Sequence, residues 1–346
     1  MNQTEVTKEG LKHERPEREA TTGVVAGRKQ RRDTMVPPAK FQSYYGKPVI
    51  NKPVWASPDI PGYLFLGGLA GASSLLGAGG QLTKRRGLAR VSKAAAAAAG
   101  GLSLVALVHD LGRPARFLNM LRVFKVTSPM SVGSWLLSAY VPAAGLAALS
   151  EMTGAVPLLG TAASCGAAVL GPAVASYTAA LISNTAVPAW HEGHKTMPFV
   201  FVASGASAAG GLAMAAAPLA ESGPARRLGL AGGAVELALT KAMEHQMHPA
   251  VRKSYHEGKA KWLIRAAEAL TAAGILGGFA AGRRSRLGAG ISGACLVAGS
   301  ACTRFGIFWA GEASALDPQA TLTPQRERFE EKISFEKGAE VEELRG

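Results

Sequence analysis

Residues 196–217 read TMPFVFVASGASAAGGLAMAAA, a run of 22 residues without a charged side chain. A helix that crosses ~30 Å of hydrocarbon needs about 20 such residues. Comparable apolar runs recur along the chain and predict an all-α integral membrane protein. We expect eight transmembrane helices, near residues 62–82, 88–109, 131–152, 156–182, 196–217, 226–247, 260–281 and 287–310.

Composition agrees with a membrane protein. The 346 residues are 48% hydrophobic and 18% charged, which is too apolar for an ordinary soluble chain of this length. The net charge of +14 comes from basic residues in the tails and in short loops between apolar runs. Such residues face lipid headgroups. Because no continuous basic face is present, nucleic acid is excluded as a partner.

The chain divides into five expected regions. Residues 1–40 form a disordered polar tail, and residues 41–61 form an interfacial segment rich in proline and aromatic residues. Two four-helix bundles follow at 62–182 and 183–310, and residues 311–346 form a polar tail. An even number of spans puts both termini on one side, called side A here; the opposite side is side B. Basic residues are too evenly divided between the two sides to fix the orientation.

Two features of the expected helices bear on their packing. Small residues spaced by four, as in the pairs Gly67/Gly71, Gly229/Gly233 and Gly274/Gly278, let membrane helices approach closely. The sixth span is the most polar, because it contains Glu236, Lys241 and Glu244.

The segment after the second span carries the densest set of polar residues. It reads HDLGRPARFLNM from His109 to Met120. Gly112 permits a turn there and Pro114 prevents the helix from continuing. Residue types alone favour a capped turn with arginines that face lipid headgroups.

Four blocks of sequence resemble the NrfD/PsrC family, the membrane subunits of polysulfide-reductase-like complexes. The most specific is VHDLGRPARFLNMLRVFKVTSPMSVGSWLLSAY at residues 108–140. The others are IPGYLFLGGLAGASSLL at 60–76, GPAVASYTAALISNTAVPAW at 171–190 and TRFGIFWAGEASALDP at 303–318. They follow the family's order and cover most of residues 55–318. The first tail lies outside the resemblance.

The resemblance implies two packed four-helix bundles with a quinol headgroup site in the first. It also implies an iron–sulfur (ferredoxin-like) partner subunit over that site, a molybdopterin catalytic subunit, and no haem. Apart from His13 in the tail, every histidine falls at an expected helix end or in a loop, not on facing helices where a b haem is held. The three cysteines, Cys165, Cys295 and Cys302, form no CxxC pair, so the chain is expected to hold neither an iron–sulfur cluster nor another metal.

Five residues are the expected site. A quinol needs hydrogen-bond partners for two oxygens and a base that water can reach. We assign Asp110 as the group that accepts or relays the proton, with His109 beside it. Tyr63 and Tyr177 position the headgroup, and Arg113 is assigned to the same binding site. The alternatives are that the tyrosines are interface anchors, and that Asp110 only pairs with Arg113 or with Arg116.

The second bundle carries charges inside expected spans, at Glu236, Arg265, Glu268 and Arg304. Intramembrane charges usually face a protein interior or a water path. Arg265 and Glu268 fit a simple i,i+3 ion pair. The other interpretation is a proton path through these residues.

Together these features predict a quinone-reactive anchor subunit in the cell membrane of a prokaryote. It would exchange electrons between menaquinone or ubiquinone and the iron–sulfur partner. Two other functions stay open. A secondary transporter also has many helices with buried charges, but it predicts an internal repeat, and the two halves show no convincing similarity. The second is a membrane anchor without a quinone site.

Overall fold

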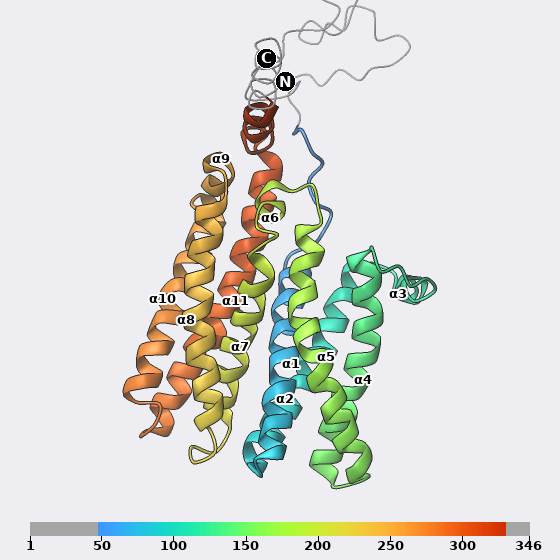
Figure 1. Ribbon diagram of the computed structural model, residues 1–346, viewed down its shortest axis with the longest axis vertical. Helices are drawn as coiled ribbons and strands as arrows, with labels where there is room; N and C mark the ends of the chain where they lie inside the picture. Colours follow the sequence, from blue (N-terminus) through green and yellow to red (C-terminus); the bar gives the residue numbers. More distant parts are fainter. Residues whose placement is uncertain (1–47, 330–346) are drawn as a thin grey trace, which may run out of the picture.

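The computed structural model describes residues 48–329. The expected tail 1–40 lies outside this part of the chain, as does the C-terminal tail beyond residue 329. Eight long helices run nearly parallel to one another (Figure 1). They are α1 (Asp59–Leu82), α2 (Arg86–Asp110), α4 (Pro129–Thr153), α5 (Pro157–Ser183), α7 (Met197–Ala216), α8 (Gly223–Gln246), α10 (Gly258–Ala280) and α11 (Arg286–Leu316). No strand occurs among the described residues.

Short helices lie between the long ones, at one end of the molecule (Figure 1). They are α3 (Ala115–Met120), α6 (Pro188–His191), α9 (Pro249–Arg252) and the 3₁₀ turn η2 (Lys253–Tyr255). The two ends of the described chain, residues 48 and 329, lie at this same end (Figure 1). It is therefore side A, and the tight turns at the opposite end are side B.

Seven of the eight long helices are long and apolar enough to cross a membrane. The exception among them is α8, which has low hydropathy because it carries Arg226, Arg227, Glu236, Lys241 and Glu244. The chain is thus an all-α, multi-pass membrane protein, and an eighth span through α8 remains a prediction. In its favour, α8 packs along α7 and α10.

The expected helix bounds agree with the structure to within three residues, with one exception. The last helix continues to Leu316, six residues beyond the expected end at 310. The reason is that Glu312 and Ser314 are buried against protein, and so the polar residues there do not end the helix. After Asp317 a further helical segment occupies residues 318–329.

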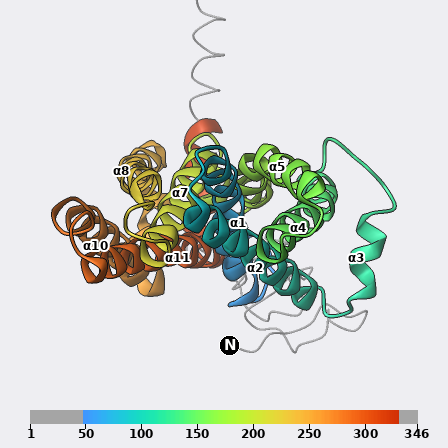
Figure 2. The same cartoon turned by 90° about the horizontal axis from the view of Figure 1, so that it is seen from below.

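The helices pack as two groups of four. The first bundle contains α1, α2, α4 and α5, and the second contains α7, α8, α10 and α11. Figure 2 shows the groups side by side, and they meet along α1 and α7. A side chain added at Gly205 of α7 would meet the backbone of Gly68 on α1, so the two bundles touch through glycine.

Candidate functional site

The ends of α1 and α2 are joined at side A by two hydrogen bonds. Asp59, in the first turn of α1, lies with Oδ2 2.7 Å from Nδ1 of His109 in the last turn of α2. The backbone N–H of Ala56 donates to Oδ1 of Asp110 at 2.9 Å. Asp110 therefore fixes the segment that leads into α1. His109 itself is open to its surroundings, with 77% of its side chain exposed.

Tyr63 and Tyr177 meet inside the first bundle. Their ring centroids are 6.5 Å apart and the rings are nearly perpendicular, at 72°, an arrangement that aromatic pairs favour. A Cβ at Gly133 on α4 would collide with the Tyr177 ring, so glycine makes room for it. Both tyrosines are buried, at 1% and 9% exposure.

The two tyrosines differ in their polar contacts. The backbone carbonyl of Tyr63 accepts a hydrogen bond from the Ser103 hydroxyl at 3.2 Å. The Tyr177 hydroxyl is buried and has no partner among the described residues. A buried polar group without a partner costs free energy. The Tyr177 hydroxyl is thus a buried donor whose hydrogen bond is not made within the described chain.

These two sets of residues lie in successive layers. Tyr63 follows Asp59 by four residues, which is about 6 Å along a helix. Ser103, bonded to Tyr63, precedes His109 by six residues, or about 9 Å. The tyrosine pair is therefore deeper in the bundle, and the Asp59–His109 pair lies between it and side A.

Arg113 does not join this group. It lies exposed in the turn after α2, where Gly112 adopts a φ of 69°. Arg116 donates to the backbone carbonyl of Leu111 at 3.0 Å. Within residues 48–329, neither arginine forms an ion pair with Asp110, whose carboxylate binds the Ala56 N–H instead.

A cavity opens at side A between the first segment of the described chain and the α5–α6 connection. Its volume is about 530 Å³. Trp55 and Trp190 form one wall, stacked with ring centroids 5.5 Å apart. The Trp190 indole N–H donates to the carbonyl of Ile307 on α11 at 2.9 Å. Trp55, in the wall of this cavity, directly precedes Ala56, whose N–H binds Asp110.

Tyr255 supports this wall from the second bundle. Its hydroxyl donates to the carbonyl of Ala189 at 3.0 Å. Burial raises the pKa of Tyr255 well above its usual value, so this group stays a neutral donor at ordinary pH.

Sequence reasoning missed two members of this region. Asp59 is the partner of His109, and its place directly after Pro58 at a helix start was the signal for an acidic N-terminal residue. The role of Trp190 depends on contacts with Trp55 and Ile307, which are distant in sequence. No local pattern could have revealed it.

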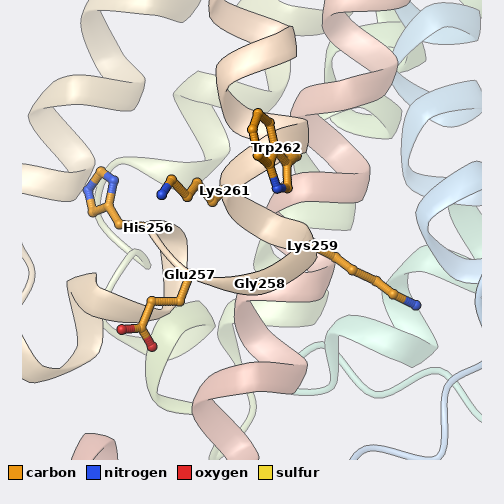
Figure 3. Close-up of a pocket in the computed structure, with 6 residues that line it drawn as sticks. All are labelled: His256, Glu257, Gly258, Lys259, Lys261 and Trp262. Atoms are coloured by element: carbon orange, nitrogen blue, oxygen red, sulfur yellow. The ribbon is translucent and has the colours of Figure 1, made fainter.

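Other concave surfaces offer a less coherent set of groups. A pocket of about 490 Å³ lies at the start of α10 and is lined by His256, Glu257, Gly258, Lys259, Lys261 and Trp262. Figure 3 shows these side chains diverging, with Lys259 directed away from His256. Within the described residues, no group of three or more His, Cys, Asp or Glu side chains is placed to hold a metal ion.

One comparison with known proteins gives a match that covers the whole first bundle. A family model described as "Polysulphide reductase, NrfD" matches residues 49–223, which is half of the chain. The match includes the α1–α2 junction, both tyrosines and α7, and it ends where α8 begins. A search of curated proteins found no match. The chain belongs to the NrfD family of membrane proteins.

Proposed function

We propose that this protein is the quinone-reactive membrane subunit of an oxidoreductase complex in the plasma membrane of a prokaryote. It exchanges electrons between menaquinone or ubiquinone and an iron–sulfur partner that serves a molybdopterin catalytic subunit. The observation that carries the proposal is the buried tyrosine pair, in which Tyr177 keeps an unpartnered hydroxyl. Family membership supports a membrane subunit of a redox complex.

The residues fit a quinol headgroup chemically. A bound quinol supplies two electrons and two protons. The Tyr177 hydroxyl donates a hydrogen bond to one of its oxygens, while the Tyr63 ring offers an apolar edge for packing. An oxygen needs such a donor in a buried site because water is absent there. In this proposal Arg113 acts only near the entrance, since its side chain is exposed.

The proton acceptors lie on the side A edge of the site. If Nδ1 of His109 carries the proton shared with Asp59, its Nε2 is free to accept another. We propose that His109 and Asp110 receive and relay quinol protons toward water at side A. Asp110 has a second role, because its bond to Ala56 holds the segment that carries Trp55.

A binding experiment on the whole chain tests this site without its partners. The chain in lipid nanodiscs is titrated with a short-chain menaquinone analogue while tryptophan fluorescence is followed. We expect saturable quenching through Trp55 and Trp190, weakened about tenfold in Tyr63→Ala and in Tyr177→Ala. Tyr140→Phe is the control, because the Tyr140 hydroxyl forms a hydrogen bond with Ser74 and is not part of the proposed site. Quenching that does not saturate, or that is unchanged in both alanine variants, would favour an anchor without a quinone site.

The partner is proposed to dock on side A. This surface comprises residues 48–55, 113–125 and 188–198, together with Tyr44 and Tyr45, which lie outside the described residues. Aromatic and arginine side chains are enriched at protein interfaces. In a purified complex, chemical crosslinks from the iron–sulfur subunit should concentrate in these segments. Crosslinks mainly from Arg226 or Arg284, on side B, would contradict this arrangement.

A further inference from the structure

The second bundle contains a buried carboxyl group and a buried guanidinium group that the proposed electron exchange does not use. Glu236 on α8 is 1% exposed, and Arg304 on α11 is fully buried. Glu236 lies ten residues before the side A end of α8, which is about 15 Å along the helix. Charged groups at such depth are costly and usually serve a function.

Neither group is saturated by its neighbours. The Thr303 hydroxyl donates to Oε1 of Glu236 at 2.7 Å, and Nη2 of Arg304 donates to the carbonyl of Phe201 at 2.6 Å. Oε2 of Glu236, together with Nε and Nη1 of Arg304, has no hydrogen-bond partner in the described chain. The Arg304 guanidinium also lies over the Phe201 ring, with Cζ 3.6 Å from the ring centroid, so the atom left to bind a water or a proton is Oε2 of Glu236.

A cavity beside Glu236 has room for water. The volume open to water is about 10 Å³, which is the lower limit for a single water molecule. Its polar lining comes from Glu236, Thr240, Thr303 and Glu268. A water needs two to four polar partners, and this lining provides them. The cavity thus links the acid on α8 with the acid on α10.

From Glu268 a series of titratable groups leads to side A. Glu268 pairs with Lys241 of α8 and not with Arg265, the i,i+3 partner that the sequence suggested, which is exposed on α10. Lys241 lies 3.7 Å from Glu244, and Glu244 lies 3.4 Å from His256. Lys241, Glu244, His256 and Arg252 line an open groove of about 670 Å³. His256 lies in the loop before α10 (Figure 3).

We propose that Glu236 is a proton-exchange site, connected to side A through the cavity water, Glu268 and the Lys241–Glu244–His256 groove. In the exchange, the Glu236 carboxylate takes up one proton from the water and Arg304 keeps its charge. The proton returns by the same route. The titratable groups that face Glu236 are Glu268 from α10 and Arg304 from α11. Lys241 and Glu244 lie farther along its own helix, toward side A. The described helix α7 contributes only hydroxyls, because it has no ionisable side chain.

Infrared difference spectroscopy on the full chain in nanodiscs tests the proposal without any partner or quinone. When pH is lowered, we expect a carboxyl C=O band that shifts in D₂O and is missing in Glu236→Gln. Glu312→Gln is the matched control, since Glu312 is also buried but pairs with Lys52 at 3.5 Å. If the Glu236→Gln chain does not fold, a displaced band in Glu236→Asp identifies the same carboxyl group. A spectrum that no Glu236 variant alters would overturn the proposal.

The route is tested separately, by the rate at which this band shifts after transfer to D₂O. Filling the cavity with Thr240→Leu, or removing the relay with Glu268→Gln, should slow the shift about tenfold or more. Thr271→Val is the control, because Thr271 is buried on the same helix as Glu268 but one turn farther from side A. Exchange as fast in both route variants as in the unaltered chain would rule out this path.

Discussion

The two bundles have the same number of long helices but differ in where their buried polar groups lie. In the first bundle, α1 and α5 meet backbone to backbone at Gly71 and Gly171. The main clusters of polar side chains lie toward the two ends of this bundle. The tyrosine pair lies toward side A, and the Lys93–Glu151 ion pair lies toward side B. In the second bundle, the buried pair Glu236 and Arg304 is central, and further charged groups lead from it to side A. Glycine contacts of the same kind join α7 to α11 in the second bundle, at Gly211 and Gly293, so the difference between the bundles lies in the side chains around Glu236 and Arg304 and not in glycine packing.

The glycine contact gives the largest expected effect. A Cβ at position 71 would overlap the Gly171 carbonyl, so Gly71→Val should destabilise the chain by about 3 kcal/mol or more through overpacking. We expect little monodisperse protein in detergent. Gly79→Val is the control on the same helix, because a Cβ there meets nothing within 4 Å. Equal yields and thermal midpoints for the two variants would show that the first bundle does not depend on this close approach.

The next effect concerns the side A end of the same bundle. Asn at position 110 can still accept the Ala56 N–H through Oδ1, but it is no longer a base. Asp110→Asn should therefore leave assembly intact and slow quinol-linked electron transfer by roughly a hundredfold, the range for loss of a general base. The measurement is quinol oxidation by the purified complex. Near-normal transfer in Asp110→Asn, with failed assembly in Asp110→Ala, would instead make Asp110 a structural residue.

The opposite end of the first bundle tests stability alone. Lys93 donates to Glu151 at 2.7 Å and to Gln81 at 2.6 Å, which ties α2 to α4 and α1. Glu151→Leu leaves the Lys93 ammonium buried without its counter-charge and should cost about 2 kcal/mol, less than a fully buried pair because Glu151 is partly exposed. Lys93→Met combined with Glu151→Leu should recover most of this loss. Thermal unfolding in detergent gives both values, and additive losses would show that the two side chains act independently.

Much of this fold follows from local sequence. Uninterrupted apolar runs gave helix bounds close to those observed, because a helix in lipid must satisfy its own backbone. The run from Gly112 to Pro114 likewise predicted the end of α2. The extension of α11 through Glu312 was not predictable, because Lys52, whose ammonium pairs with this carboxylate, is far away in the sequence. For α8, the charged residues argue against a membrane span, whereas its packing along α7 and α10 favours one.

The site was predictable only in part. The sequence singled out Tyr63 and Tyr177, and the structure brings them together. It also singled out His109 and Asp110, but their partners Asp59 and Ala56 lie 50 and 54 residues away in sequence. The same limit applies to Glu268, whose partner is on a neighbouring helix and not one turn away. Long-range pairs depend on helix packing, which residue spacing within one helix does not encode.

The smallest effect separates binding from stability at two tyrosines of the first bundle. The Tyr177 hydroxyl has no partner in the described chain, whereas the Tyr140 hydroxyl lies 2.7 Å from the Ser74 hydroxyl. Tyr140→Phe should therefore lower stability by about 1 kcal/mol, the usual value of one hydrogen bond, and leave quinol oxidation unchanged. Tyr177→Phe should not lower stability and should raise it slightly, because it removes a buried hydroxyl that has no partner within the described chain. It should weaken quinol binding about two- to tenfold, as expected for one lost hydrogen bond to the headgroup. Thermal midpoints and the KM for a quinol analogue, measured on both variants, give the comparison. If Tyr177→Phe changes neither quantity, the tyrosine pair is only a packing contact, and the headgroup would have to bind nearer the cavity beside Trp55 and Trp190.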